Sequence, residues 1–222
     1  MIPLSPRLLC CASMVTGSYA CDIGTDHAYL PVYLIMSGKC AHVLATDIRT
    51  GPLESAAATV RRYRTEKSIR LLQSDGFDSV PAKGITDVII AGMGGETIRD
   101  ILSGQHAGFI RQGVNLVLQP MTKAEVLRPW LAENGFSVIK EVIVRDTHIY
   151  TVMQVQYTGE TRVLTPAEAY IGKLSHTELL TKIYIADVQK RLNTKAEGLE
   201  SAGNTAEAEK IRAVIREISR SL

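Results

Sequence analysis

The chain alternates short apolar segments with amphipathic ones, and this alternation restricts its possible folds more than any other feature of its 222 residues. Apolar segments that are typical of strands lie at residues 18–24, 42–48, 69–77, 87–95 and 115–120. Strands that alternate with helices pair in parallel, because each helix carries the chain back across the sheet. Two more apolar segments, 138–145 and 150–157, are four residues apart and predict a hairpin. We therefore expect an α/β fold with a doubly wound, mostly parallel sheet and one antiparallel strand at or near its edge.

Proline residues indicate where the helices begin, because proline lacks a backbone N–H group and is tolerated in the first turn of a helix. Ser5–Pro6 predicts a short leading helix. Pro31 predicts a helix that begins near the preceding residue, which leaves residues 24–29 as a loop after the first strand. Thr122 and Glu125 have the spacing of a capping box and predict a helix start after the fifth strand.

The pattern becomes purely helical from about Thr161. A start signal at residues 165–168 is followed by apolar residues at helical spacing: Tyr170, Ile171, Leu174, Ile183, Ile185, Val188 and Leu192. Gly203 and Asn204 indicate the end of this helix and the cap of a second one. We expect an antiparallel, coiled-coil-like helix pair at 161–222, appended to a domain formed by residues 1–160.

The composition excludes several classes of protein. A formal net charge of +2 gives no whole-protein argument for nucleic-acid binding, so any basic surface must be local. No apolar run reaches the roughly 18 residues of a membrane span, and the first residues do not resemble a signal peptide. We therefore expect a cytoplasmic protein without a membrane partner. The four cysteines show no C-x-x-C spacing, which argues against a metal site or a disulfide framework.

Polar residues and glycines follow the predicted strands at their carboxyl ends. Asp22, Asp47, Asp75 and the run Gly92 to Gly95 all occupy such positions. In a doubly wound sheet these ends meet at one edge, where ligands bind. Asp47 also lies about 25 residues after the end of the first strand, which suits the hydroxyl groups of a ribose. An acid at a strand end is equally typical of a helix cap.

The loop after the first strand is acidic where nucleotide-binding loops usually have glycines. Gly24 is followed by Asp26 and His27. A pyrophosphate above this loop would face the carboxylates of Asp22 and Asp26, and buried like charges repel strongly. S-adenosylmethionine would instead bring a sulfonium and an ammonium group to the loop. The acidic residues therefore favour this ligand over a dinucleotide.

Six motifs occur in an order that resembles one family: DIGTDHAYLP, GPLESA, SDG, IAGMGG, LQP and LRPWLAENGF. Together they are similar to the bacterial tRNA adenine-N1 methyltransferases that modify position 22 of tRNA. The leading LSPRL, the hairpin and the helical tail also match the layout of this family, so the resemblance covers essentially the whole chain. It implies a class I, Rossmann-like methyltransferase fold, S-adenosylmethionine as the methyl donor and tRNA as the acceptor.

The resemblance also implies roles for single residues. At the methionine part of the cofactor, it puts Asp22, Gly24, Asp26 and His27. It puts Asp47 at the ribose, and Asp75 and Gly76 at the adenine. It puts Gly92 and Met93 at the cofactor, on the side that faces the target base. Those expected to contact the RNA substrate are Arg7, Tyr29, Gly94, Gly95, Gln119 and Pro120. Asp26 is the expected catalytic residue. Three residues depart from the family pattern: Asp47 in place of glutamate, Thr25 in place of serine and Met121 in place of asparagine.

Several of these residues also have a purely structural interpretation. Gly92, Gly94 and Gly95 would let a strand turn tightly into a helix. His27 would serve as a helix cap, and Tyr29 is as consistent with core packing as with stacking on a base. Lone Trp130 is more typical of the core.

The basic residues 61–70 are typical of a solvated helix face and end. An alternative is a discontinuous surface for tRNA phosphates, formed together with Arg7 and with basic residues of the tail: Lys182, Lys190, Arg191 and Lys195.

Adenine N1 has an in-plane lone pair, so its methylation depends on positioning more than on deprotonation. The target base must be flipped out, because N1 lies on the Watson–Crick edge. Other functions remain open at this point: methylation of another RNA or of a small molecule, an NAD-type oxidoreductase, or a non-catalytic RNA-binding protein. A monomer is favoured, although no motif decides the oligomeric state.

Overall fold

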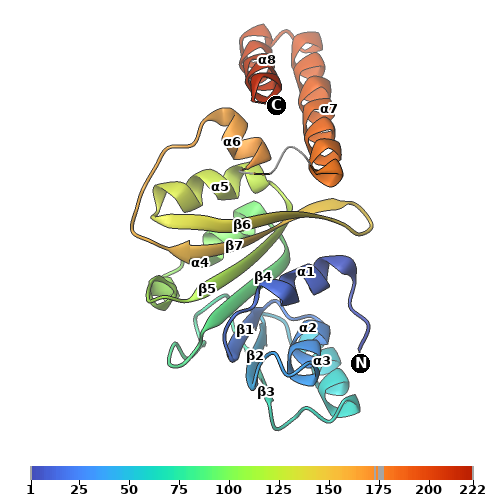
Figure 1. Cartoon of the computed structure of the whole chain (residues 1–222), viewed down its shortest axis with the longest axis vertical. Helices are drawn as coiled ribbons and strands as arrows, with labels where there is room; N and C mark the ends of the chain where they lie inside the picture. The colour runs from blue at the N-terminus through green and yellow to red at the C-terminus, as the bar shows by residue number, and fades with distance from the viewer. Residues whose placement is uncertain (1, 173, 175–177, 222) are drawn as a thin grey trace.

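The computed structural model describes residues 2–172, 174 and 178–221. Its centre is a seven-stranded sheet with the order β3-β2-β1-β4-β5-β7-β6 (Figure 1). The strands are β1 Tyr19–Ile23, β2 His42–Asp47, β3 Ile69–Gln73, β4 Asp87–Gly94, β5 Asn115–Thr122, β6 Phe136–Arg145 and β7 Ile149–Tyr157. The first five pair in parallel, and β7 is antiparallel to both of its neighbours. The predicted sheet, with one antiparallel strand next to its edge, is confirmed.

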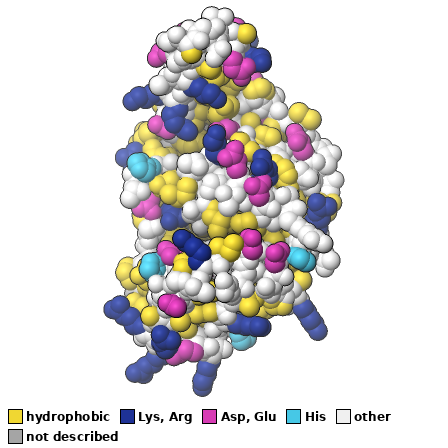
Figure 2. All heavy atoms as spheres, turned by 180° about the vertical axis from the view of Figure 1, so that it is seen from behind, with side chains coloured by type: hydrophobic (Ala, Val, Ile, Leu, Met, Phe, Trp, Pro, Cys, Tyr) yellow, Lys and Arg dark blue, Asp and Glu magenta, His cyan; other side chains and the backbone are white. Residues whose placement is uncertain are grey.

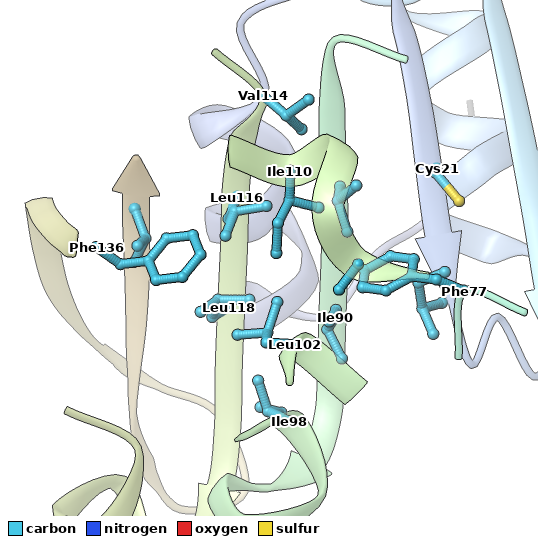
Figure 3. Packing of buried hydrophobic residues seen from close by; sticks show 14 of the residues in the cluster. Cys21, Phe77, Ile90, Ile98, Leu102, Ile110, Val114, Leu116, Leu118 and Phe136 are labelled. Carbon is cyan, nitrogen blue, oxygen red and sulfur yellow. The ribbon is translucent and has the colours of Figure 1, made fainter. Parts of the chain in front are cut away.

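Helices cover both faces of the sheet. The helices α1 Pro6–Met14, α2 Tyr29–Met36 and α3 Thr50–Arg62 pack on one face, whereas α4 Gly95–Leu102, the 3-10 helix Ala107–Arg111 and α5 Ala124–Glu133 pack on the other. Alternate residues of each strand face opposite sides, so Ile89 belongs to the first layer while Val88 and Ile90 belong to the second. Figure 3 shows the second layer, where side chains of α4 and β5 interdigitate. This two-layered core holds the carboxyl ends of the strands in place.

The start of α5 differs from the prediction. The helix begins at Ala124, and the residue before it, Lys123, has a left-handed backbone (φ 59°) and makes no side-chain cap hydrogen bond. The expected capping box fails because Thr122 still belongs to β5, where it pairs with Gly94. A residue held in a strand does not cap the next helix.

Within the described residues, the helical tail contains three helices, α6 Pro166–Ile171, α7 Leu179–Ser201 and α8 Thr205–Arg220, instead of the predicted two. The start signal is a true capping box, in which the Glu168 N–H donates to the Thr165 hydroxyl over 3.2 Å. The first helix nevertheless ends at Ile171, because Gly172 leaves the helical conformation with φ 67° and ψ −164°, and Arg128 donates to the last carbonyl groups. Residues 173 and 175–177, which the predicted helix would include, lie outside the described residues. The predicted turn at Gly203 is confirmed.

A buried ion pair connects this tail to the sheet. The side chains of Arg128 on α5 and Glu141 on β6 are each only 2% exposed and lie 2.7 Å apart. Arg128 also donates to the carbonyl oxygens of Ala169 (2.8 Å) and Tyr170 (2.9 Å) and to the Tyr184 hydroxyl (3.2 Å). Burial is the largest single influence on the pKa of Arg128 and lowers it, but Glu141 and Tyr184 together raise the pKa above its ordinary value, so the guanidinium stays charged. These contacts join segments on both sides of residue 160. The domain boundary predicted at that residue remains a prediction.

Among the described residues no helix combines the length and the apolar character needed to cross a membrane. In the same part of the chain, no group of three or more His, Cys, Asp or Glu side chains is arranged to hold a metal ion.

Candidate functional site

The candidate site lies at the carboxyl ends of β1, β2, β4 and β5. The chain order of the strands reverses between β1 and β4, which is where ligands bind in open α/β sheets. Most residues expected at the ligand are on the loops that leave these four strands. The sheet therefore brings together segments that are about 100 residues apart in the chain.

Asp22 is the buried acid of this site. It is 5% exposed, and burial raises the pKa of its carboxyl to about 6; the neighbouring charge of Asp47 adds to the rise. The Thr25 hydroxyl is close enough to Asp22 to moderate the rise in pKa. That hydroxyl is itself buried, and no group among the described residues has the geometry of a hydrogen-bond partner to it. An unsatisfied hydroxyl beside a buried carboxylate is the kind of arrangement that a polar or cationic ligand completes.

The loop 24–28 has an unusual backbone. The N–H groups of Gly24 and Thr25 both donate to the Thr46 carbonyl oxygen over 2.8 Å, which ties the loop to β2. Gly24, Asp26 and Ala28 all have positive φ values (77°, 49° and 55°). Such a conformation is strained for residues with a side chain and is common at binding sites. The loop therefore keeps its shape through backbone contacts.

Asp26 and His27 point outward from this loop. Their side chains are 68% and 48% exposed, and His27 Nε2 lies 3.6 Å from Asp26 Oδ2. The ring of Tyr29 is 44% exposed and stacks on His27, with ring centroids 5.3 Å apart and an angle of 16° between the planes. Tyr29 is therefore a surface ring at the site, and the alternative of core packing is wrong.

The glycines of the IAGMGG segment bring the loops into contact. Gly92 has φ 83°, and its neighbour Met93 places its methyl group against Gly24, where a β-carbon on Gly24 would overlap it. Gly95 packs so closely on the Lys123 carbonyl oxygen that a β-carbon would overlap it as well. Gly94 is the N-cap residue of α4 and has ordinary contacts. The structural interpretation thus holds for Gly92 and Gly95, and their predicted ligand contacts remain predictions.

Gln119 connects three segments at the floor of the site. Its side chain is fully buried, and its Oε1 accepts hydrogen bonds from Arg7 Nη1 (2.6 Å) and from the Gly92 N–H (3.0 Å). Its Nε2 donates to the Pro120 carbonyl oxygen over 2.9 Å. Arg7 was predicted to contact RNA phosphates, and the structure fixes one side of its guanidinium at the site. The link between Arg7 and Gln119 has no local signal in the sequence.

The acids on β2 and after β3 lie at the same edge. Asp47 is 7% exposed, and its Oδ1 accepts a hydrogen bond from the Arg49 N–H over 2.9 Å. The N-cap residue of α3 is Arg49, and this helix has no side-chain cap hydrogen bond. The backbone carbonyl of Asp47 accepts from the Ser74 N–H, which holds the next loop beside it. Asp75 is exposed, and Gly76 turns the chain with φ 48°. Asp47 is therefore not the cap of α3, and its predicted role as a ligand group remains a prediction.

The basic residues do not form one surface. Figure 1 shows α3, which carries the first part of the 61–70 cluster, and the α7–α8 pair at opposite ends of the long axis. On the face shown in Figure 2, basic side chains lie at both ends and mix with acidic ones between them. Trp130 stacks on Phe136, with ring centroids 5.8 Å apart, and packs on the core as predicted.

Comparisons with known proteins agree with this geometry. A family model described as a methyltransferase domain matches residues 4–153. The chain is 36% identical to the tRNA (adenine(22)-N(1))-methyltransferase of Bacillus subtilis over 147 residues, which are 65% of this chain and 61% of that enzyme. It is 30% identical to a putative tRNA methyltransferase of Mycoplasma pneumoniae over 171 residues, which are 73% of this chain and 77% of that protein.

Solved structures match over more of the chain. The crystal structure of the Bacillus subtilis enzyme has a TM-score of 0.86 and 25% identity, and the match covers 98% of this chain and 99% of that one. A putative tRNA methyltransferase of Streptococcus pneumoniae, solved in complex with S-adenosyl-L-methionine, has a TM-score of 0.83 and 26% identity and covers 97% and 99%.

Proposed function

Because the chain belongs to the methyltransferase-domain family, we propose that it transfers a methyl group from S-adenosylmethionine to N1 of adenine 22 in bacterial tRNA. The observation that carries this proposal is the extent of the structural match. It covers 98% of the chain, so it includes the helical tail as well as the methyltransferase domain. A tRNA substrate also places the activity in the bacterial cytoplasm.

The residues present fit the proposed cofactor. When bound, S-adenosylmethionine supplies an electrophilic methyl group on a cationic sulfur. The buried Asp22 carboxylate and the unsatisfied Thr25 hydroxyl suit the cationic methionine part. Asp47 uses only Oδ1 within the described part of the chain, which leaves Oδ2 to accept from ribose hydroxyls. Asp75 and Gly76, on the neighbouring loop, suit the adenine.

The remaining residues suit the target base. Tyr29 offers an exposed ring for stacking, and Pro120 lies beside Met93 on the neighbouring strand. Methylation at N1 makes the adenine cationic, so a carboxylate that faces the base stabilises the charge as it develops. We assign this role to the exposed Asp26, which is also able to take the proton that the amino group later loses.

The direct test uses two tRNA transcripts that differ only in having adenine or guanine at position 22. We expect labelled methyl groups to enter the adenine transcript alone and nucleoside mass spectrometry to show 1-methyladenosine. Equal labelling of both transcripts would contradict the position, and labelling of neither would contradict tRNA as the substrate. Calorimetry with S-adenosylmethionine and with NAD separately tests the cofactor, and tight binding of NAD would contradict it.

A further inference from the structure

A cavity of about 650 Å³ lies beside the candidate site and contains none of the cofactor residues. Its walls come from residues 120–125 between β5 and α5, from residues 145–151 around the β6–β7 turn, and from α7. Figure 1 shows the tip of the β6–β7 hairpin beside the lower end of α7. A volume of this size is typical of sites for small ligands and accommodates a nucleotide.

The cavity shares a wall with the candidate site. The segment 120–125 begins directly after Gln119, and Pro120 and Thr122 pair with Met93 and Gly94 of β4. If the target base of a nucleic-acid chain lies at Met93, the adjoining nucleotide of that chain therefore reaches the cavity. Its other wall, which includes Tyr184 and Arg191, belongs to the helical tail. A ligand in the cavity would touch both parts of the molecule.

The charges around the cavity suit an anion at its rim. Lys123 and Arg145 are exposed and form no ion pair within the described part of the chain. The wall also carries three carboxylate residues, Glu125, Asp146 and Asp187, and a third cation, Arg191. Arg191 pairs with Asp187 at 3.1 Å, and the pKa of Asp146 is lowered by its neighbours Ser5 and Arg7.

Glu125 is half-buried in the cavity wall, where a carboxylate is able to accept from the amino group of a base. Two uncompensated cations beside one such acceptor match a nucleotide, which combines an anionic phosphate with a base that donates hydrogen bonds.

Lys123 is held in place by the site itself. Its left-handed backbone (φ 59°) is strained for a residue with a side chain, and its carbonyl packs on Gly95 at the start of α4. The position of this cation therefore depends on the same glycine segment that contacts Gly24 through Met93.

We propose that this cavity binds the nucleotide that adjoins the target adenine in the RNA chain, with Lys123 and Arg145 on its phosphate. The proposal rests on the proposed function, because it needs an RNA substrate. A base flipped out for methylation forces its neighbour out of regular stacking, and a pocket for that neighbour stabilises the open form. The cavity thus acts as a second nucleotide subsite between the catalytic edge and the tail.

The test uses Lys123→Asn, Arg145→Gln and the double variant. Asparagine tolerates a left-handed backbone, so Lys123→Asn removes the charge and keeps the loop. Lys83→Asn is the matched control, because Lys83 is also exposed and lies outside the cavity. The measurements are tRNA affinity between low and physiological salt, cofactor affinity by calorimetry, and single-turnover methylation.

We expect each cavity variant to weaken tRNA binding about tenfold and to lower the salt slope by about one, as for a lost phosphate contact. Cofactor affinity should stay unchanged. Cavity variants that bind tRNA like the Lys83 control, while the wild type binds and methylates it, would overturn the subsite alone. A wild type that neither binds nor methylates tRNA would overturn the proposed function instead.

A photo-crosslink provides a second readout. A tRNA with 4-thiouridine next to the target adenine should crosslink to peptides that contain residues 120–125 or 145–151. Crosslinks confined to other peptides would overturn the subsite.

Discussion

Asp22 destabilises the ligand-free protein at neutral pH. Because burial raises the pKa of its carboxyl from 3.8 to about 6, folding favours the protonated form. This contribution to stability is fully present below pH 3.8 and is lost as the pH rises through about 6. A bound cation would offset the loss. Asp22 therefore lowers the stability of the empty protein and raises its affinity for a cationic ligand.

The variant Asp22→Asn should therefore stabilise the empty protein at pH 8 and weaken cofactor binding. The pKa shift of Asp22 corresponds to a gain in the free energy of unfolding of at most about 3 kcal/mol. This gain over the wild type should vanish near pH 4. Denaturant unfolding at the two pH values measures it. Asp75→Asn, which removes an exposed acid from the same edge, is the control. A variant less stable than the wild type at pH 8 would show that the carboxylate is satisfied within the folded protein.

The variant Asp26→Asn tests the proposed electrostatic role. The side chain is 68% exposed, so its charge becomes effective only when the target base covers it. Asparagine keeps the shape and tolerates the left-handed backbone of residue 26. We expect kcat and kcat/KM to fall together by about a hundredfold, with KM for tRNA nearly unchanged. Single-turnover methylation at saturating cofactor measures this, and a loss of threefold or less would limit Asp26 to shaping the loop.

Among the helices and strands, the joint between α5, β6 and α6 sets the position of the tail. Gly172 ends α6 with φ 67° and ψ −164°, a conformation almost restricted to glycine. It lies directly on the ion pair, since a β-carbon at this position would overlap Glu141 Oε2 and lie 2.9 Å from Arg128 Nε. The Thr151 hydroxyl also donates to Glu141 over 2.5 Å. A change at Gly172 therefore disturbs the joint without touching the candidate site.

We expect Gly172→Ala to lower the free energy of unfolding by about 3 kcal/mol or more, because it adds backbone strain and disturbs a buried charge pair. Its matched control is Gly203→Ala, which has a similar φ of 79° but nothing within 4 Å of the new β-carbon. That control should cost only about 1 kcal/mol. Chemical denaturation of both variants measures the difference, and equal losses would show that the ion pair tolerates the displacement.

For the whole molecule, the question is where the methyltransferase domain ends. Truncation to residues 1–160 should leave a domain that binds cofactor but has lost most tRNA affinity, because the tail is absent. It also removes the acceptors of Arg128 at Ala169 and Tyr170, whereas truncation to residues 1–172 keeps them. We therefore expect the longer fragment to be the more stable one by about 2 kcal/mol or more.

Both fragments should bind tRNA equally weakly. Thermal unfolding and cofactor calorimetry of the two fragments provide the measurements. An insoluble longer fragment would make the tail part of the core, and full-rate methylation of tRNA by either fragment would exclude the tail as an RNA-binding element.

Local patterns in the sequence were sufficient for the order of the elements and for the sheet. Strand and helix periodicities, proline positions and the Thr165–Glu168 capping box depend on neighbouring residues, so one chain suffices to predict them. The acids at the strand ends were predictable for the same reason, because parallel strands bring their carboxyl ends to one edge. The motifs then indicated the family, which the comparisons confirm.

The tertiary structure decided what depends on contacts between distant segments. Arg7 and Gln119 are 112 residues apart, and Arg128 meets Ala169 across 41 residues. No periodicity encodes such pairs, so the place of Arg7 was not predictable, whereas the end of the first tail helix does have a local signal, Gly172. The failed capping box at Thr122 has the same cause, since pairing with Gly94 keeps that residue in the strand. Local propensities amount to tenths of a kcal/mol per residue, and a ladder hydrogen bond or a buried charge outweighs them.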